Sequence, residues 1–242
     1  MQGLILAGGE GSRLAASGVT TPKALVPVRG VPQLVRLARV LERAGVASLT
    51  CLVRQGVPLD PIRPELDRLR LPVRTHECLT PSSLHTLVAG LAVTPPGEVF
   101  CTMVDTVMPV ADWLRVYADA RTLIGGGADV VLAVTPFIDD ERPLYVVRDA
   151  AGRVTRVTDD PMAAPLVTGG VYAFGPRARA AAAAALDAGQ ERMRAFLRTV
   201  VATGFDVRTV EVERIVDLDH RRDLDIANAW QDSCDEGDPP MG

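Results

Sequence analysis

Short apolar runs alternate with amphipathic helical patterns along the first half of the chain. Residues 4–7 and 49–53 are runs of the length and composition typical of buried strands. Between them, apolar residues recur every three or four positions over residues 34–44 and charged residues fill the other face, which predicts a helix that ends at Gly45. The run 128–134 has one charge, near its start, as in a sheet buried on both faces. This alternation predicts an α/β fold with a largely parallel sheet.

The same pattern predicts the remaining elements. Further strands are expected at residues 71–75, 98–104, 167–174 and 207–212, and a hairpin from 144–148 and 153–158 around the turn 149–152. Helices are expected near 65–70, from the Thr80-Pro81-Ser82-Ser83 segment onward, and at 110–123, 177–187, 191–202 and 218–230, with Thr80 as a possible cap. We therefore expect one domain over residues 1–231, with halves at 1–135 and 136–231, and a polar tail at 232–242.

Composition excludes several functional classes. A net charge of −4 and an aromatic content of 4% disfavour a non-specific grip on nucleic acid. Membrane spans need roughly 18–20 uninterrupted apolar residues, and the sequence has no such stretch. The four cysteines lack zinc-site spacing, and Cys51 and Cys101 lie in apolar runs, so we expect buried thiols. With no signal-peptide pattern at the N-terminus, these features predict a cytoplasmic protein that binds neither nucleic acid nor membrane.

The most informative stretch is a glycine-rich loop that follows the first strand. It contains Gly8, Gly9 and Gly11, then Arg13, and Pro22-Lys23 follows shortly after. Glycines let backbone N–H groups approach phosphate oxygens, and the two cations would neutralise their charge. Lys23 is the only lysine among 26 basic residues, which suggests a role that arginine cannot fill, such as an ammonium between two phosphates.

Two motifs in this region carry a family resemblance. The segments L-A-G-G-x-G-S-R-L and P-K-A-L-V-P-V resemble the signature of the nucleotidyltransferases that make nucleotide-sugars and related NDP or CMP conjugates. The resemblance implies a Rossmann-like, three-layer α/β/α fold with a mostly parallel mixed sheet. It also implies that Arg13 clamps the β- and γ-phosphates and that Lys23 bridges the α-phosphate and the acceptor phosphate. The resemblance further implies that the nucleotide is contacted by Leu6, Ala7, Gly8, Gly9, Gly11 and Ser12. For Ser82 and Ser83 two roles stay open: contact with the base or ribose, or capping of a helix.

Three aspartates are candidate ligands of Mg²⁺. Asp105 ends an apolar strand, where a carboxylate is costly to bury unless a metal or a cation meets it; a capping role in a turn before Pro109 is the alternative. The family resemblance implies a metal-binding Asp here, and a second one in a segment that matches residues 215–224. Within that segment Asp217 aligns with the family's first Asp, but Asp219 would point to the same side, so the metal could sit on either or both. We expect Asp223 to be structural, in the first turn of the last helix.

The acceptor side departs from the family pattern. Family members usually carry E-K-P before a strand of the type [ND]-[AT]-G-[IV]-Y, whereas this chain has Asp159-Asp160-Pro161 and then Thr168-Gly169-Gly170-Val171-Tyr172. We assign Asp159, Asp160 and Gly170 to the acceptor site. Two carboxylates repel a second phosphate and attract an amine or hydroxyls. Three alternatives stay open: the acceptor is held differently, it is an unusual one such as an aminosugar, a cyclitol or a phosphonate, or acceptor activity has been lost.

Together these features predict an Mg²⁺-dependent nucleotidyltransferase. It would join an NTP to a small phosphorylated acceptor, such as a sugar-1-phosphate, and release pyrophosphate. The alternatives are a cytidylyltransferase for a phosphonate or phospho-alcohol acceptor and a non-catalytic nucleotide-binding homologue. The expected partners are the NTP and the acceptor, with a homo-oligomer as a further possibility, and the base of the nucleotide stays open.

Overall fold

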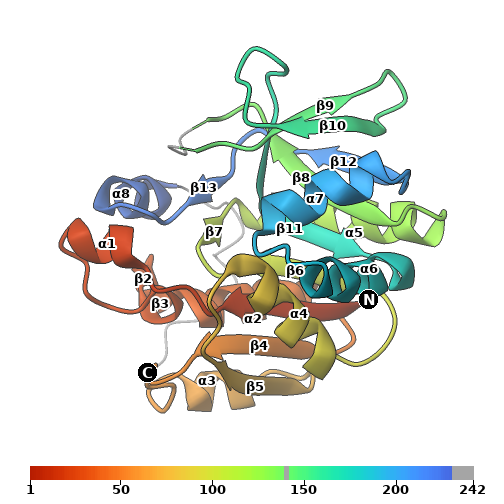
Figure 1. Cartoon of the computed structure of the whole chain (residues 1–242). Coiled ribbons are helices and arrows are strands. Elements are labelled where there is room, and N and C mark those ends of the chain that lie inside the picture. Colours follow the sequence, from red (N-terminus) through yellow and green to blue (C-terminus); the bar gives the residue numbers. More distant parts are fainter. Residues whose placement is uncertain (139–141, 231–242) are drawn as a thin grey trace.

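A computed structural model describes residues 1–138 and 142–230. Its centre is a mixed sheet whose main path runs β10-β9-β11-β6-β1-β4-β5 (Figure 1). The parallel strands β1 (Gln2–Ala7), β4 (Leu49–Arg54), β5 (Val73–Cys78) and β6 (Val99–Met103) form one half of this sheet. β11 (Val167–Phe174) runs antiparallel to both β6 and β8 (Val130–Thr135), and β12 (Val207–Glu211) extends the sheet in parallel with β8. The predicted α/β class with a mostly parallel mixed sheet is confirmed.

Helices cover both faces of the sheet. α2 (Gln33–Ala44), α3 (Arg63–Asp67) and α5 (Val110–Gly125) lie on one face, and α4 (Ser83–Val93), α6 (Pro176–Asp187) and α7 (Met193–Ala202) lie on the other (Figure 1). Successive residues of a strand point to opposite faces. In β1, Ile5 therefore packs with the core beneath α2 and α5, while Leu4 and Leu6 pack with the core beneath α4, α6 and α7. The central strands are buried on both faces, which explains their unbroken apolar runs.

Most predicted elements form, and the differences lie where long-range pairing decides the structure. The expected last helix, 218–230, begins only at Arg221 and ends at Ala229 (α8), because the backbone N–H groups of Leu218 and Asp219 donate to the carbonyls of Asp105 and Asp217 instead. The preceding residues Val216–Asp217 form a short strand, β13, paired with β7 (Thr106–Val107). Thr80 does not cap α4, since the cap position is Ser82 and the Thr80 hydroxyl lies 2.6 Å from that of Thr86.

Short elements follow the glycine loop and were not expected. They are α1 (Ser12–Ala16), the 3-10 turn η1 (Lys23–Leu25), β2 (Pro27–Val28) and β3 (Val31–Pro32).

The predicted hairpin forms from β9 (Tyr145–Arg148) and β10 (Val154–Thr158). The Asp149 carboxylate closes its turn by accepting from the backbone N–H groups of Ala151 and Arg153, each at 2.9 Å.

No helix within residues 1–138 and 142–230 is long and apolar enough to cross a membrane. Cys51 and Cys101 are free and fully buried, as predicted. Cys234 and the predicted tail from residue 232 lie outside the described residues. The boundary between the two expected halves, at residues 135 and 136, stays a prediction.

Candidate active site

Two of the three glycines in the loop after β1 have a structural reason, whereas Gly9 has open space around it. A Cβ on Gly8 would lie 2.9 Å from both the Cys78 sulfur and a Thr86 methyl carbon. Gly11 has a φ of +65°, and a Cβ there would lie 3.3 Å from the Lys23 stem. Glycine at these two positions lets the chain turn tightly from the end of β1 into α1. The loop thus lies at the carboxyl ends of the parallel strands, where such sheets bind ligands.

Lys23 is the electrostatic centre of the site. η1 directs its side chain under the loop, and its Nζ donates to Asp105 Oδ2 and to Asp219 Oδ1, each at 2.7 Å. The side chain is only 10% exposed. Burial by itself lowers the pKa of Lys23, but the nearby carboxylates of Asp105 and Asp219 outweigh it and raise that pKa above its ordinary value. Lys23 is therefore a firmly protonated ammonium, and Arg13 donates to the second oxygen of Asp219.

Two distant segments bring the aspartates together. Asp105 lies in the turn between β6 and β7, and the pairing of β7 with β13 sets Asp217 opposite Thr106. The backbone N–H of Leu218 donates to the Asp105 carbonyl at 2.9 Å, and this bond holds the segment after β13 beside Asp105. Asp217 Oδ1 lies 3.4 Å from the Thr106 hydroxyl. The antiparallel β7–β13 pair thus holds Asp105, Asp217 and Asp219 on one side of the same cavity.

Asp223 has the structural role that its position predicts. Its side chain is buried in the first turn of α8. One of its carboxylate oxygens accepts from the backbone N–H of Asp219 at 3.0 Å and from that of His220 at 2.6 Å. A carboxylate that accepts these N–H groups caps the helix and fixes the turn that carries Asp219.

The donor chemistry of the three aspartates suits a divalent cation. Carboxylate oxygens are the ligands that Mg²⁺ prefers, and Asp105 and Asp219 already converge on one cation, the Lys23 ammonium. Among the described residues, no three acidic, histidine or cysteine side chains lie close enough together, as placed, to hold a metal ion. The residues therefore fit Mg²⁺ in charge and donor type, and the metal would compete with Lys23 for Asp105 and Asp219.

A cavity of about 530 Å³ lies between the glycine loop and α4. Leu6, Gly8, Gly9, Ser82 and Ser83 line it, as the predicted nucleotide site requires, whereas Ala7 is buried in the core. Both serines are also engaged with the segment before α7. The Ser82 hydroxyl donates to the Glu191 carbonyl, and the Ser83 hydroxyl accepts from the Met193 backbone N–H at 3.0 Å.

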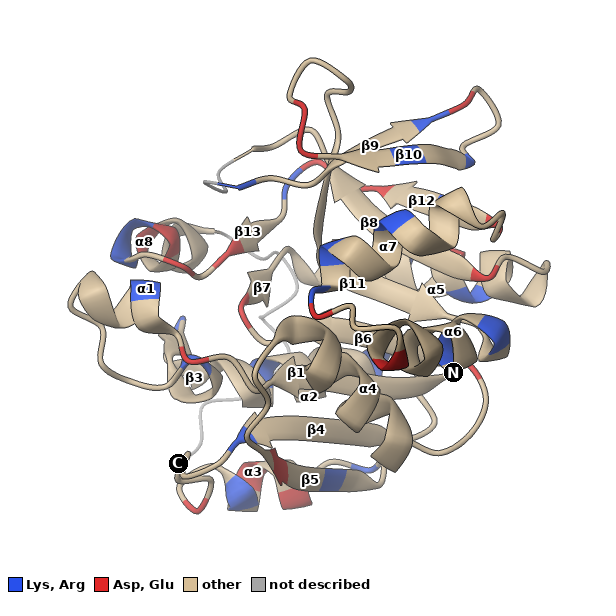
Figure 2. Cartoon of the chain, viewed as in Figure 1, with Lys and Arg blue, Asp and Glu red and all other residues tan. Residues whose placement is uncertain are grey.

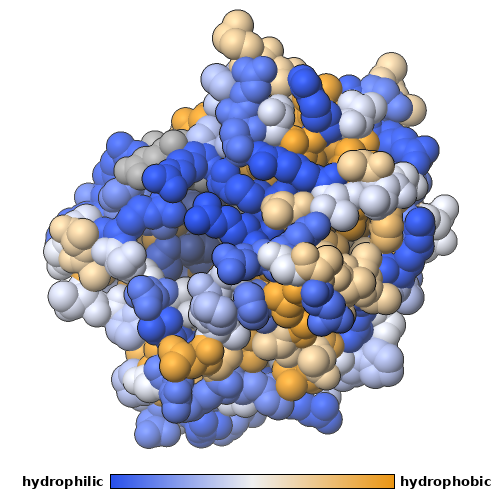
Figure 3. Space-filling view, viewed as in Figure 1, coloured by the Kyte–Doolittle hydropathy of each residue, from blue (hydrophilic) through white to orange (hydrophobic). Residues whose placement is uncertain are grey.

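A second cavity, of about 490 Å³, adjoins the first. The two share Glu10, Ser83 and Met103 in their linings. Gly11, Ser12, Arg13, Lys23 and the three aspartates line one part of it. Gly170 also lines it; this residue has a φ of +74°, and a Cβ there would lie 2.6 Å from the Thr106 hydroxyl oxygen. In Figure 3 strongly hydrophilic residues gather around a hollow on this face of the molecule, between α1 and α8 on one side and α7 on the other.

Asp159 and Asp160 lie outside both cavities. Asp159 accepts from Arg194 at 2.8 Å and from Arg198, both on α7, and the hydrogen bond from Arg198 and the charges of the two arginines hold the pKa of Asp159 below its usual value. Asp160 closes a local turn by accepting from the backbone N–H of Met162 at 3.0 Å. Instead of these carboxylates, the cavity lining contains three arginines that the sequence patterns did not indicate: Arg142, Arg192 and Arg194.

Comparison with known proteins agrees with this geometry. Residues 3–205 match the model of the MobA-like NTP transferase domain. The chain belongs to this family. No curated protein matches the sequence. For this MobA-like chain, solved structures of similar fold include a putative glucose-1-phosphate thymidylyltransferase from Bacillus anthracis in complex with a sucrose, with 16% identity and a TM-score of 0.80 over 95% of this chain and 94% of that one.

Two further solved structures share the fold. The inositol-1-phosphate CTP transferase from T. maritima has 16% identity and a TM-score of 0.74, with 93% of each chain covered. The nucleoside-diphosphate-sugar pyrophosphorylase from Vibrio cholerae RC9 has 15% identity and a TM-score of 0.72, over 95% of this chain and 100% of that chain. At these identities the likeness shows that the MobA-like chain has the fold of these proteins over nearly its whole length.

Proposed function

We propose that this MobA-like protein transfers a nucleotidyl group from an NTP to a small phosphorylated acceptor and releases pyrophosphate. One observation carries the proposal: the Lys23 ammonium and the Arg13 guanidinium meet Asp105 and Asp219 where a nucleotide-sized cavity adjoins a second cavity. Nucleotidyl transfer needs this combination, because two anionic substrates must be held close together.

The reaction is a displacement at the α-phosphorus of the NTP. An oxygen of the acceptor phosphate forms a bond to that phosphorus, and the bond from the phosphorus to the oxygen that bridges to the β-phosphate breaks, so that pyrophosphate leaves with the electron pair. The loop N–H groups at Gly8, Gly9 and Gly11 bind phosphate oxygens. Lys23 lies between the two reacting phosphates, and Arg13 neutralises the charge that develops on the leaving group. A magnesium ion held by Asp105 with Asp217 or Asp219 would add further charge neutralisation.

The acceptor side supports an anionic acceptor. The missing lysine of the E-K-P pattern is offset by arginines from other segments, Arg142, Arg192 and Arg194, which line the second cavity. Because Asp159 is paired with α7 and lies outside the cavity lining, its charge does not face the acceptor directly. The structural neighbours are named for glucose-1-phosphate and inositol-1-phosphate substrates, and we propose acceptors of this size.

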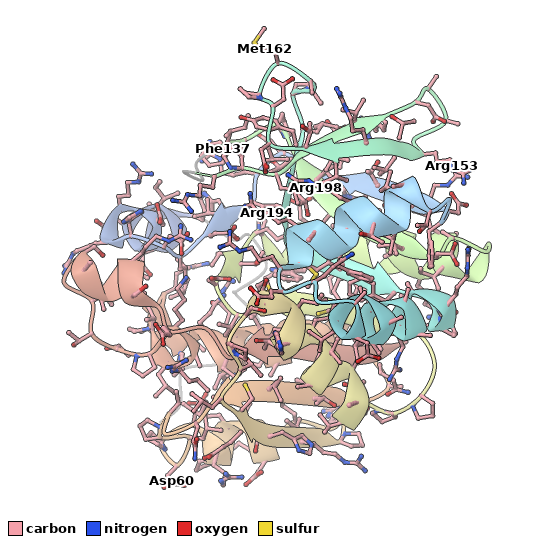
Figure 4. All side chains as sticks on the ribbon, viewed as in Figure 1. Asp60, Phe137, Arg153, Met162, Arg194 and Arg198 are labelled. Carbon is pink, nitrogen blue, oxygen red and sulfur yellow. The ribbon has the colours of Figure 1, made fainter. Side chains whose placement is uncertain are left out.

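The test is pyrophosphate release from each NTP with Mg²⁺ and a panel that includes glucose 1-phosphate and inositol 1-phosphate. We expect Lys23→Ala to lower turnover about 100-fold or more, since it removes a cation that contacts the reacting phosphates. Arg153→Ala is the control, because Arg153 is an exposed arginine on the β9–β10 hairpin, outside both cavities (Figure 4). Equal rates for the wild type and Lys23→Ala would contradict the proposal. Tight NTP binding by calorimetry without turnover on any acceptor would favour a non-catalytic nucleotide-binding protein.

A further inference from the structure

Among the described residues, three arginines line the acceptor end of the second cavity, and further basic residues on α7 are blue in Figure 2. Arg142 lies just before β9, Arg192 directly precedes α7, and Arg194 lies in the first turn of that helix. The carboxylates in the lining belong to Glu10, Asp105, Asp217 and Asp219, which come from the glycine loop and the β7–β13 region. Among the residues that the structure describes, the acceptor end therefore contributes three guanidinium groups to the lining and no carboxylate.

Hydrogen bonds hold two of these arginines together. Arg194 donates to Asp159 at 2.8 Å and to the backbone carbonyl of Arg142 at 3.0 Å, so the segment before β9 is tied to α7. Asp159 must also neutralise Arg198, one turn further along the helix (Figure 4). One carboxylate between two guanidinium groups leaves a net charge of +1 on this cluster. Arg192 adds a full charge, since its side chain forms no hydrogen bond or ion pair with any other described residue.

The segment that carries Arg192 is anchored to the nucleotide side. The Glu191 carbonyl accepts from the backbone N–H of Leu84 at 3.0 Å and from the Ser82 hydroxyl, and the Met193 N–H donates to Ser83 at 3.0 Å. Arg192 therefore lies on backbone that is bonded on both sides to the first turn of α4. Its Cα position is fixed at the edge of the second cavity, although its guanidinium group has no protein partner among the described residues.

We infer that Arg142, Arg192 and Arg194 form a second anion subsite, which takes an acidic group of the acceptor other than the phosphate that reacts. This inference rests on the proposed function, which places the reacting phosphate beside Lys23 and Arg13. A guanidinium group matches a carboxylate or a phosphate with two parallel hydrogen bonds. A neutral sugar would leave the Arg192 guanidinium group without an anionic partner among the described residues, whereas a carboxylate or a second phosphate would neutralise it. The acceptor class is thus a phosphorylated acid or a bisphosphate.

The test compares ligand pairs that differ only in the second acidic group. Ethyl phosphate is paired with 2-phosphoglycolate, and glucose 1-phosphate with glucuronic acid 1-phosphate, so that a short and a long span are both sampled. Each is titrated calorimetrically into the full chain with its nucleotide site filled by a non-hydrolysable NTP analogue. We expect the acid of at least one pair to bind about tenfold tighter than its neutral partner, as for one added charge-assisted contact.

Arg192 provides the variants. Arg192→Gln should weaken binding of the acid more than binding of its neutral partner and so abolish the preference for the acid. Arg192→Lys should restore part of the preference, and Arg153→Gln should have no effect. If neither acid binds better than its neutral partner, or if the preference survives Arg192→Gln, the subsite is refuted. The two proposals fail separately. Acid preference without turnover on any acceptor refutes the transferase alone, and turnover of neutral acceptors without acid preference refutes the subsite alone.

Discussion

Replacement of Lys23 by methionine should destabilise the protein in a way that Mg²⁺ reverses. Methionine keeps an unbranched apolar stem of similar length and removes only the ammonium group. The variant therefore leaves the carboxylates of Asp105 and Asp219 facing one space without the cation that each contacts at 2.7 Å. Arg13 still contacts Asp219 in this variant.

The structure sets the expected size of this effect. Removing one partner of a fully buried ion pair costs about 3–5 kcal/mol. The side chains of Lys23, Asp105 and Asp219 are 10%, 21% and 19% exposed. Water therefore offsets part of the loss, and we expect a fall of about 2–4 kcal/mol in the free energy of unfolding. For a chain of this length, that corresponds to a fall of about 5–15 °C in Tm.

The pH dependence follows from the direction of the pKa shift of Lys23. Burial lowers this pKa, but the two carboxylates more than compensate, so the folded-state pKa lies above the ordinary value. The contribution of Lys23 to stability is then fully present below its unfolded-state pKa of about 10.4 and is lost as the pH rises through the folded-state pKa. The difference between the wild type and Lys23→Met should hold at pH 8 and shrink above about pH 10.4.

Thermal unfolding in EDTA and in a series of Mg²⁺ concentrations provides the assay. Because no ammonium group competes for the carboxylates in the variant, Mg²⁺ should raise the Tm of Lys23→Met more than that of the wild type. Arg153→Met is the charge-matched control. Arg153 is 46% exposed and lies 3.7 Å from Asp206, so its loss should cost less than about 0.5 kcal/mol. The reasoning is refuted if Lys23→Met melts within about 2 °C of the wild type in EDTA, or if Mg²⁺ stabilises both proteins equally.

Three further predictions concern single residues. Asp105→Asn should lower pyrophosphate release about 100-fold while circular dichroism shows a folded chain, because a metal-binding charge is lost; unchanged turnover would contradict this role. Gly170→Ala should cost about 1–3 kcal/mol in denaturant unfolding, from a positive φ and a clash with Thr106; an unaltered midpoint would argue against the strain. Burial raises the pKa of Cys51 to about 12 and that of Cys101 further. Neither thiol should react with a disulfide reagent at pH 8 before unfolding, and peptide mapping of label on either in the folded protein would be the contrary result.

The buried thiols also make the free energy of unfolding depend on pH. Cys51 stays neutral in the fold, whereas an unfolded thiol ionises above about pH 8.5. The raised folded-state pKa therefore gives a contribution to stability that is present below about pH 8.5 and declines as the pH rises above it. Unfolding midpoints should fall over this range, and Cys51→Ser would weaken the dependence.

The fold could be predicted from sequence wherever the local pattern decides the structure. The strands β1, β4 and β8 are short apolar runs, and a run of this kind has few alternatives to a strand buried on both faces. The start of the last helix could not be predicted in this way. The sequence pattern starts this helix at residue 218, but the backbone N–H of Leu218 donates to the Asp105 carbonyl, and no local signal marks a partner so far away in sequence.

The residues that line the expected nucleotide end could be picked out from sequence because their pattern is local, and their roles stay predictions. The glycines, Arg13 and Lys23 lie within one short stretch, and Asp105 stands out as a carboxylate at the end of an apolar strand. Arg192 carries no such mark in a chain with many arginines. Its place at the cavity depends on how the segment before α7 docks on Ser82 and Ser83, which only the folded chain shows.

At the acceptor end, the basic residues lie on α7 and the acidic residues lie in the Asp159-Asp160 segment, where the family pattern has a lysine. The family pattern has a lysine in the segment where this chain has Asp159-Asp160, and the sequence alone suggested an acidic acceptor site. In the structure, Asp159 accepts hydrogen bonds from Arg194 and Arg198 of α7, and these two cations lower its pKa. A carboxylate shared by two guanidinium groups cannot cancel both, so the α7 side keeps a positive charge. The acidic segment thus positions arginines at the cavity, and an anionic acceptor remains the one that this electrostatic arrangement favours.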